Sequence, residues 1–362
     1  MSKNRIVVIK IGTKVITSSD KSLDKALLKG LIAQISDILD KGLKVIVVTS
    51  GAIGAGMGLL GMKKRPVKTE ELQAAASIGQ SRLMHLYSDY FKERGYLTGQ
   101  ILLTQEDFND RNRYLNIKKT IETLLSHKAV PVINENDTVS TEEIKCGDND
   151  RLSSLVSDLC RVDMLMLLTD VDGLLDEKYS VINLVDGMSS RITKLARESL
   201  CEFGTGGMAS KLESIGKATA SGIECVIANG KTKNIIADII DGKPVGTRFK
   251  SSGMKLLAKK RWIAFSSKPR GSIYVDSGAR EALSNKNRSL LASGIVGLDG
   301  QFVMGDVVRI TDKSFREFAR GLTNYSSSEL SKIKGLKTAD IRNVLGRKAP
   351  DEVIHKDNLV IL

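Results

Sequence analysis

A chain of 362 residues is long for one domain, so its length predicts two. A content of 41% hydrophobic and 27% charged residues is that of a soluble globular protein, and no stretch approaches the roughly 18 uncharged apolar residues of a membrane span. The four cysteines have no paired spacing, which predicts reduced thiols in the cytoplasm, and three scattered histidines argue against a zinc site or a histidine-based triad.

The positive charge is concentrated in the last third of the chain. Residues 251–362 hold 20 Lys and Arg against 11 Asp and Glu, an excess of +9, whereas the first 250 residues carry an excess of +4. Such a bias is compatible with nucleic-acid binding, although a solvated basic face is its commoner cause.

Continuous apolar runs alternate with amphipathic helical patterns over the first 230 residues. The runs predict strands at 6–11, 45–48, 97–103, 129–133, 164–168 and 224–228, and the patterns predict helices at 22–41, 70–94, 114–126, 152–159 and 208–221. Apolar strands alternating with helices predict an α/β fold in which helices sandwich a mostly parallel sheet.

Four of these strands end in polar or glycine residues. The ends are Gly12 and Thr13, Ser50 and Gly51, residues 134–137, and Thr169 and Asp170. Ligands bind outside the carboxyl ends of the strands in such sheets, so the four ends predict one shared binding crevice.

The stretch 129–159 contains two polar clusters within seventeen residues. Asn134 to Asp137 follow one predicted strand, and residues 147–150 open directly into a helical pattern. Amides and carboxylates in this position suit a small zwitterion, whereas the alternative is an Asx-rich turn with a capped helix.

Two glycine-rich stretches offer backbone N–H donors to an anion. Residues 50–61, SGAIGAGMGLLG, favour an anion-binding turn or simple packing over a dinucleotide site, because their G-x-G-x-x-G begins well after the strand has ended. Residues 204–211, GTGGMASK, lack the P-loop spacing but suit nucleotide phosphates, with an ordinary glycine-rich loop as the alternative.

Lys10 and Lys211 are predicted to reach the same sheet edge from distant parts of the sequence. Lys10 lies near the end of a buried strand, and Asp150 at a helix start could hold both ammonium groups. Phosphoryl transfer requires positioning and charge neutralisation, which two lysines, glycine N–H groups and Mg²⁺ would supply. A purely structural salt bridge is the alternative for Asp150.

Residues 251–270 interrupt the alternation with charges, serines and a proline. We place the first domain at 1–252, a linker at about 253–269 and a second domain at 270–362. Short β-like runs at 271–275, 294–296, 306–310 and 359–362 predict a small β-rich barrel.

Several motifs together resemble the amino-acid kinase superfamily, and the pair NENDTVS and GDND resembles its glutamate 5-kinase branch in particular. The others are VIKIG, TSGAIGAG, LLTDVDGL and GTGGMASK, and the segment GIVGLDGQFVMGDVVRI resembles a PUA domain. The resemblance covers essentially the whole chain. It implies the amino-acid kinase fold with a C-terminal PUA-like barrel.

The resemblance also implies an activity, in which ATP phosphorylates the γ-carboxylate of L-glutamate in the first step of proline biosynthesis. Lys10, Lys211 and Asp150 would be catalytic. Glutamate would be held by Ser50, Gly51, Asn134, Asp137 and Asn149, and ATP by Lys10, Thr169, Asp170, Thr205, Gly206, Gly207, Met208, Ala209, Ser210 and Lys211. Mg²⁺ would arrive on the nucleotide phosphates, with no metal site of the protein's own.

Two departures from the family pattern are present. Residues 176–183 lack the Asp-Pro-Arg found in many relatives, and Ser210 stands where threonine is usual. The resemblance further implies proline as a feedback inhibitor, a homo-oligomer, and delivery of the product to glutamate-5-semialdehyde dehydrogenase.

Two alternatives stand beside this interpretation. One is another member of the superfamily, acting on acetylglutamate, aspartate, carbamate or UMP. The other is an RNA-binding protein with a basic PUA-like end, which is less favoured because only 4% of the residues are aromatic and the first 250 residues offer no stacking platform.

Overall fold

The computed structural model describes the chain except for residues 1–4, 19–22, 140–147, 199–206, 252–257 and 348–349. Its internal contacts divide it into two compact units, Met1–Lys255 and Leu256–Leu362, which we call the N-terminal and C-terminal units. No helix in the described ranges combines the length and apolar character that crossing a membrane requires.

The N-terminal unit is built on an eight-stranded sheet with the order β3-β4-β2-β1-β5-β7-β8-β6. Its strands are β1 (Ile6–Ile11), β2 (Lys44–Thr49), β3 (Thr98–Leu103), β4 (Val130–Glu135), β5 (Met164–Thr169), β6 (Leu184–Val185), β7 (Glu224–Asn229) and β8 (Thr247–Phe249). Every pairing is parallel except that of β7 with β8, which confirms the mostly parallel sheet.

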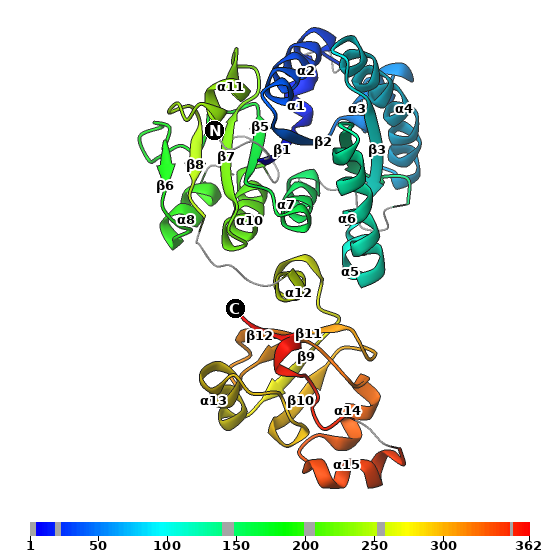
Figure 1. The fold of residues 1–362 in the computed structure, drawn as a ribbon, viewed down its shortest axis with the longest axis vertical. Helices are drawn as coiled ribbons and strands as arrows, with labels where there is room; N and C mark the ends of the chain where they lie inside the picture. The colour runs from blue at the N-terminus through cyan, green and yellow to red at the C-terminus, as the bar shows by residue number, and fades with distance from the viewer. Residues whose placement is uncertain (1–4, 19–22, 140–147, 199–206, 252–257, 348–349) are drawn as a thin grey trace. The chain divides into compact units, whose positions relative to one another are not determined.

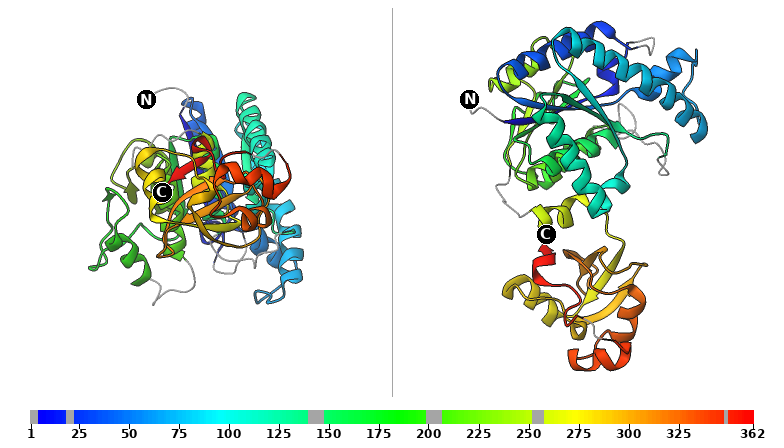
Figure 2. Two further views of the ribbon diagram at one scale, coloured as in Figure 1. Left: turned by 90° about the horizontal axis from the view of Figure 1, so that it is seen from below. Right: turned by 45° about the vertical axis from the view of Figure 1, so that its right-hand side comes forward.

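Helices cover both faces of this sheet (Figure 1). One face packs against α2 (Lys25–Asp40), α4 (Thr69–Glu93) and α11 (Ile235–Ile240), and the other against α6 (Arg111–Ser126), α7 (Asp148–Cys160) and α10 (Gly207–Ala220). Shorter helices are α1 (Thr13–Ile16), α3 (Ala52–Leu59), α5 (Gln105–Asn109) and α8 (Ser190–Glu198). The sheet between two helical layers is also visible from a second direction (Figure 2), so the predicted sandwich is confirmed.

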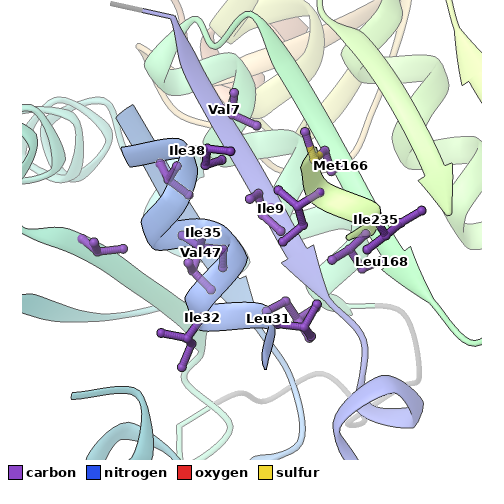
Figure 3. Packing of buried hydrophobic residues seen from close by; sticks show 14 of the residues in the cluster. Val7, Ile9, Leu31, Ile32, Ile35, Ile38, Val47, Met166, Leu168 and Ile235 are labelled. Carbon is purple, nitrogen blue, oxygen red and sulfur yellow. The ribbon is translucent and has the colours of Figure 1, made fainter. Parts of the chain in front are cut away.

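The alternation of side chains along β1 decides where Lys10 lies. Val7 and Ile9 are fully buried against α2, where they contact the cluster that includes Ile35 (Figure 3). Because successive residues of a strand point to opposite faces, Lys10 projects to the other face of the sheet, beside α7. A lysine in an apolar run is thereby removed from the hydrophobic core.

The glycines of α3 and α4 allow these two helices to approach until their backbones touch. A Cβ on Gly56 would lie 1.8 Å from the carbonyl oxygen of Ala75, and one on Gly79 would lie 1.8 Å from that of Ala52. Gly56 and Gly58 lie within helix α3 and not in the first turn after a strand. For Gly56, the close contact with Ala75 supports a role in packing.

The C-terminal unit has its own five-stranded mixed sheet with the order β10-β9-β11-β12-β13. The strands are β9 (Gly271–Val275), β10 (Ile295–Asp299), β11 (Val307–Thr311), β12 (Glu317–Leu322) and β13 (Leu359–Ile361), and the helices are α12 (Ala258–Arg261), η1 (Trp262–Ser266), α13 (Ser277–Lys286), η2 (Ala292–Gly294), α14 (Ser327–Ile333), α15 (Thr338–Leu345) and η3 (Lys356–Asn358). A second, small β-rich unit is thus confirmed. Its core, which includes Ile273, Val308 and Tyr325, is separate from that of the first sheet.

Candidate active site

Two lysines from distant parts of the chain meet at one carboxylate. Lys10 Nζ lies 2.5 Å from Asp150 Oδ1, and Lys211 Nζ lies 3.1 Å from Asp150 Oδ2. The Asp150 side chain is 1% exposed and that of Lys10 is 7% exposed. Lys211 also donates to the carbonyl oxygen of Gly207, one turn back in α10, at 3.2 Å.

The surroundings of Asp150 and Lys10 shift the pKa values of these two groups. Burial raises the pKa of the Asp150 carboxyl, but the charges of Lys10 and Lys211 and their hydrogen bonds outweigh burial and hold that pKa below its usual range. Burial lowers the pKa of Lys10, the charge of Lys211 lowers it further, and Asp150 only partly offsets both. Two lysine side chains share one carboxylate in this cluster, and such an excess of basic groups suits a phosphate.

Asp150 reaches this position because α7 begins at Asp148. A carboxylate in the first turn is stabilised by the partial positive charge of a helix N-terminus. Leu152, Leu155 and Val156 are buried on the inner side of the same helix, which contacts β1, β4 and β5. The helical pattern read from the sequence thus fixes the carboxylate against the sheet.

Asn134 and Asn149 lie side by side at the end of β4. The backbone N–H of Glu135 donates to Asn134 Oδ1 at 2.9 Å and lies 3.3 Å from Asn149 Oδ1. Asn134 Nδ2 donates to Gln80 Oε1 on α4 at 2.7 Å. Asp137 lies two residues beyond β4 and is half-buried.

Ser50 and Gly51 connect β2 to α3. Ser50 is buried, and Gly51 has φ +98°, a left-handed conformation that favours glycine. The preceding residue, Thr49, shares a 2.9 Å hydrogen bond with the hydroxyl of the fully buried Tyr87 of α4. The register of β2 against β4 sets Val48 opposite Ile133, so this turn and the asparagines occupy neighbouring strand ends.

Thr169 is the last residue of β5 and Asp170 follows it, next to the end of β1. The N–H of Gly12 donates to the carbonyl oxygen of Leu168 at 3.0 Å, which holds the two strand ends together. The Asp170 carboxylate contacts Lys14 Nζ of α1 at 3.2 Å. Partial burial raises the pKa of Asp170, but its backbone hydrogen bond and Lys14 lower it below the ordinary value.

The first turn of α10 carries the remaining residues predicted to bind nucleotide. Gly207, Met208, Ala209 and Ser210 lead into Lys211, and all but Gly207 are partly buried. Thr205 and Gly206 lie outside the described residues.

Three residues that lie beside these positions were not predicted from the sequence, namely Lys14, Gln80 and Tyr87. Lys14 had a weak signal, because it stands in the polar turn that follows the strand of Lys10. Gln80 and Tyr87 had none, since each lies within an ordinary amphipathic helix and meets its partner only through the packing of α4 on the sheet.

Within the described ranges, no group of three or more His, Cys, Asp or Glu side chains could hold a metal ion. Both oxygens of Asp150 face lysine ammonium groups, which is the environment of a salt bridge rather than of a metal ligand. The donors at this sheet edge, namely lysines and the first turn of a glycine-led helix, instead fit an anion such as a nucleotide polyphosphate.

Comparison with known proteins agrees with this arrangement. Residues 5–229 match the amino acid kinase family, and residues 271–345 match the PUA domain. This chain belongs to the amino acid kinase family and, within it, to the glutamate 5-kinase family. It is 46% identical over 362 residues to the glutamate 5-kinase of Caldanaerobacter subterraneus subsp. tengcongensis, covering 98% of this chain and 97% of that one.

Other glutamate 5-kinases are similar over nearly the whole length. Those of Citrifermentans bemidjiense and Geobacter sulfurreducens are each 42% identical, covering 100% of this chain and 99% of theirs. Among solved structures, carbamate kinase from Giardia lamblia bound to AMP-PNP has a TM-score of 0.48 and 19% identity, covering 70% of this chain and 100% of that one. That likeness is too distant to inform the substrate.

Proposed function

We propose that this amino acid kinase transfers the γ-phosphoryl group of ATP to the γ-carboxylate of L-glutamate, giving γ-glutamyl phosphate and ADP. The observation that carries the proposal is the buried Lys10–Asp150–Lys211 cluster at the carboxyl edge of the sheet. The near full-length similarity to glutamate 5-kinases supports this choice of substrate.

In the proposed reaction an oxygen of the γ-carboxylate attacks the γ-phosphorus, and the bond from that phosphorus to the β–γ bridging oxygen breaks. Charge accumulates on the transferring group and on the leaving ADP. Lys10 and Lys211 would neutralise it, while Asp150 would hold both ammonium groups in place before substrate arrives. Mg²⁺ would enter on the nucleotide phosphates and add charge neutralisation there.

The amino-acid half of the site is assigned to the ends of β2 and β4. Ser50, Gly51, Asn134 and Asn149 offer neutral donors for a carboxylate, and Asp137 offers a negative charge to the α-ammonium group. Such a mixture suits a zwitterion rather than an inorganic anion.

The nucleotide half is assigned to β5 and α10. Thr169 and Asp170 lie at the end of β5, and Gly207 to Ser210 form the first turn of α10, with Lys211 in its second turn. Backbone N–H groups at the start of that helix would face the phosphates.

A substrate panel tests the proposal. Purified protein with Mg-ATP and hydroxylamine should form γ-glutamyl hydroxamate from L-glutamate, and much less hydroxamate from N-acetylglutamate or aspartate. Coupled detection of ADP, which also reports carbamate kinase activity, provides a second readout. Turnover of another acceptor with none of glutamate would refute the proposal.

We further propose that proline inhibits by overlapping the glutamate subsite, because it shares the α-carboxylate and α-nitrogen of glutamate. Since an acyl phosphate hydrolyses readily, the product calls for a reductase that consumes it promptly, and glutamate-5-semialdehyde dehydrogenase is the expected partner. The family resemblance also supports a homo-oligomer, which light scattering on the purified protein would test.

A further inference from the structure

Gln80 contacts the amino-acid half of the site from a helix that has no assigned role in the chemistry. Its Oε1 accepts a 2.7 Å hydrogen bond from Nδ2 of Asn134, a residue that is 1% exposed. Asn134 Oδ1 accepts from the N–H of Glu135 at 2.9 Å. Both ends of the Asn134 amide are therefore held in place, the nitrogen end by Gln80, and the second N–H of Nδ2 is left for the substrate.

This contact leaves the amide nitrogen of Gln80 available. Oε1 accepts from Asn134, whereas Nε2 makes no hydrogen bond within the described part of the chain, and the residue is half-buried. A partly buried amide nitrogen carries two donors that favour an acceptor. An anionic oxygen is the strongest acceptor that a substrate of this site would offer.

The helix that carries Gln80 is held firmly on the same part of the sheet. One residue before it, Gly79 presses the backbone of α4 against Ala52 of α3, and two turns after it Tyr87 bonds Thr49, next to Ser50. Gln80 is thus fixed between the end of β2 and the end of β4, which is the preorganisation that a specificity residue requires.

We propose that Gln80 is a specificity-determining residue of the amino-acid subsite, which holds Asn134 with Oε1 and donates from Nε2 to the non-reacting α-carboxylate of the substrate. The inference rests on the proposed glutamate kinase function. The division of labour follows from charge, because Lys10 and Lys211 are engaged with Asp150 and are assigned to the transferring phosphoryl group. A neutral amide binds the second carboxylate without competing for that group.

The decisive variant is Gln80→Glu, because the new side chain has nearly the same shape and keeps an acceptor for Asn134 Nδ2 but loses the donors. The KM for glutamate should rise by about ten- to a hundredfold, since a hydrogen bond to a charged group is replaced by repulsion. The KM for Mg-ATP should stay within about twofold. Gln34→Glu is the matched control, because Gln34 Oε1 accepts from the N–H of Ile236 at 3.1 Å on α11, and it should leave both KM values unchanged.

A change of substrate separates direct contact from structural damage. Isoglutamine carries an amide in place of the α-carboxylate and keeps the γ-carboxylate. The preference of the wild type for glutamate over isoglutamine should shrink in Gln80→Glu, because the introduced carboxylate accepts from the amide of isoglutamine. Gln80→Leu offers neither a donor nor an acceptor. It should weaken the binding of both substrates without reducing the preference for glutamate over isoglutamine.

The outcomes are distinguishable. A wild-type protein that forms no γ-glutamyl hydroxamate refutes the proposed function itself. If the wild type is active, an unchanged KM for glutamate in Gln80→Glu overturns the role of Gln80 alone. An unaltered preference between glutamate and isoglutamine, with equal losses for both, likewise overturns it and leaves only a packing role.

Discussion

Lys10 and Asp150 form a buried ion pair in which Nζ lies 2.5 Å from Oδ1, and Lys211 approaches the other oxygen of the same carboxylate at 3.1 Å. One carboxylate cannot neutralise two ammonium groups, so the site keeps an excess positive charge in a region shielded from water. A purely structural salt bridge would need only one lysine for this carboxylate, and the second lysine favours the proposal that the cluster binds an anion. Two predictions follow from that imbalance.

The first concerns catalysis by Lys211. If its charge acts mainly on the transition state, Lys211→Ala should lower kcat with little effect on either KM. Loss of one preorganised charge should lower the rate by a factor of about a hundred to a thousand. Initial rates over a grid of glutamate and Mg-ATP concentrations measure this split. Near-normal turnover in Lys211→Ala would contradict the assignment, and Lys217→Ala, which removes an exposed pair with Glu213 on the same helix, serves as the control.

The second concerns the acid stability of the N-terminal unit. The two lysines hold the folded-state pKa of Asp150 below its unfolded value, so its contribution to stability is present above the ordinary carboxyl pKa and is lost as the pH falls through the folded pKa. Asp150→Asn leaves two lysines without their partner and should be less stable at neutral pH by about 3 kcal/mol. The difference should narrow towards acid pH, which urea unfolding at a series of pH values measures. If the difference in unfolding free energy between wild type and variant were the same at every pH, the pKa of Asp150 would be equal in the folded and unfolded states.

The sequence predicts some parts of this site better than others, for physical reasons. Lys10 interrupts an apolar strand, and strand alternation alone places it away from the hydrophobic core. Asp150 was identified because it precedes a helical pattern. Gln80 and Lys14 were missed, since their partners Asn134 and Asp170 are distant in sequence, and the polar turn around Lys14 is the one weak local signal for either residue.

The elements that sequence analysis missed are short or lack an apolar signal. Strand β12, with sequence EFARGL, carries two charged residues, and its pairing with β11 and β13 compensates for its weak local preference. Helix α3 was read as a glycine-rich turn. Its glycines are poor helix formers, but Gly56 allows a close helix contact that a larger residue would prevent.

That contact gives a third prediction, about stability. Gly56→Ala places a Cβ 1.8 Å from the carbonyl oxygen of Ala75, so α3 and α4 must separate, at a cost of about 1–3 kcal/mol or more. Gly58→Ala is the matched control in the same helix, because its Cβ would meet no atom within 4 Å and alanine should stabilise the helix by about 0.5–1 kcal/mol. Chemical denaturation of both variants measures the contrast. Equal effects would show that the close approach of the helices is unimportant.

A fourth prediction concerns Asp137 as the proposed partner of the α-ammonium group. Asp137→Asn should weaken glutamate binding, and should weaken proline inhibition in parallel, because both ligands carry a positively charged nitrogen beside a carboxylate. Nucleotide affinity should be unchanged. Calorimetric titrations with glutamate, proline and ATP measure the three affinities separately. If ATP binding falls by the same factor as glutamate binding, Asp137 supports the loop rather than the ligand.

The last prediction concerns the independence of the two units. Each has its own sheet and its own core, and independent cores allow domains to fold separately. The cut should fall at Lys255, because η1 belongs to the C-terminal unit, where Arg320 donates to the carbonyl oxygen of Ala264 at 2.7 Å. A cut after η1 would remove that partner from Arg320. It would also leave Trp262 and Ile263, which are buried, on the N-terminal fragment. We therefore expect residues 1–255 to unfold cooperatively and to retain phosphotransfer to glutamate, with regulation or assembly altered. Loss of both folding and activity in 1–255, alongside an active full-length chain, would show instead that the first sheet depends on the second unit.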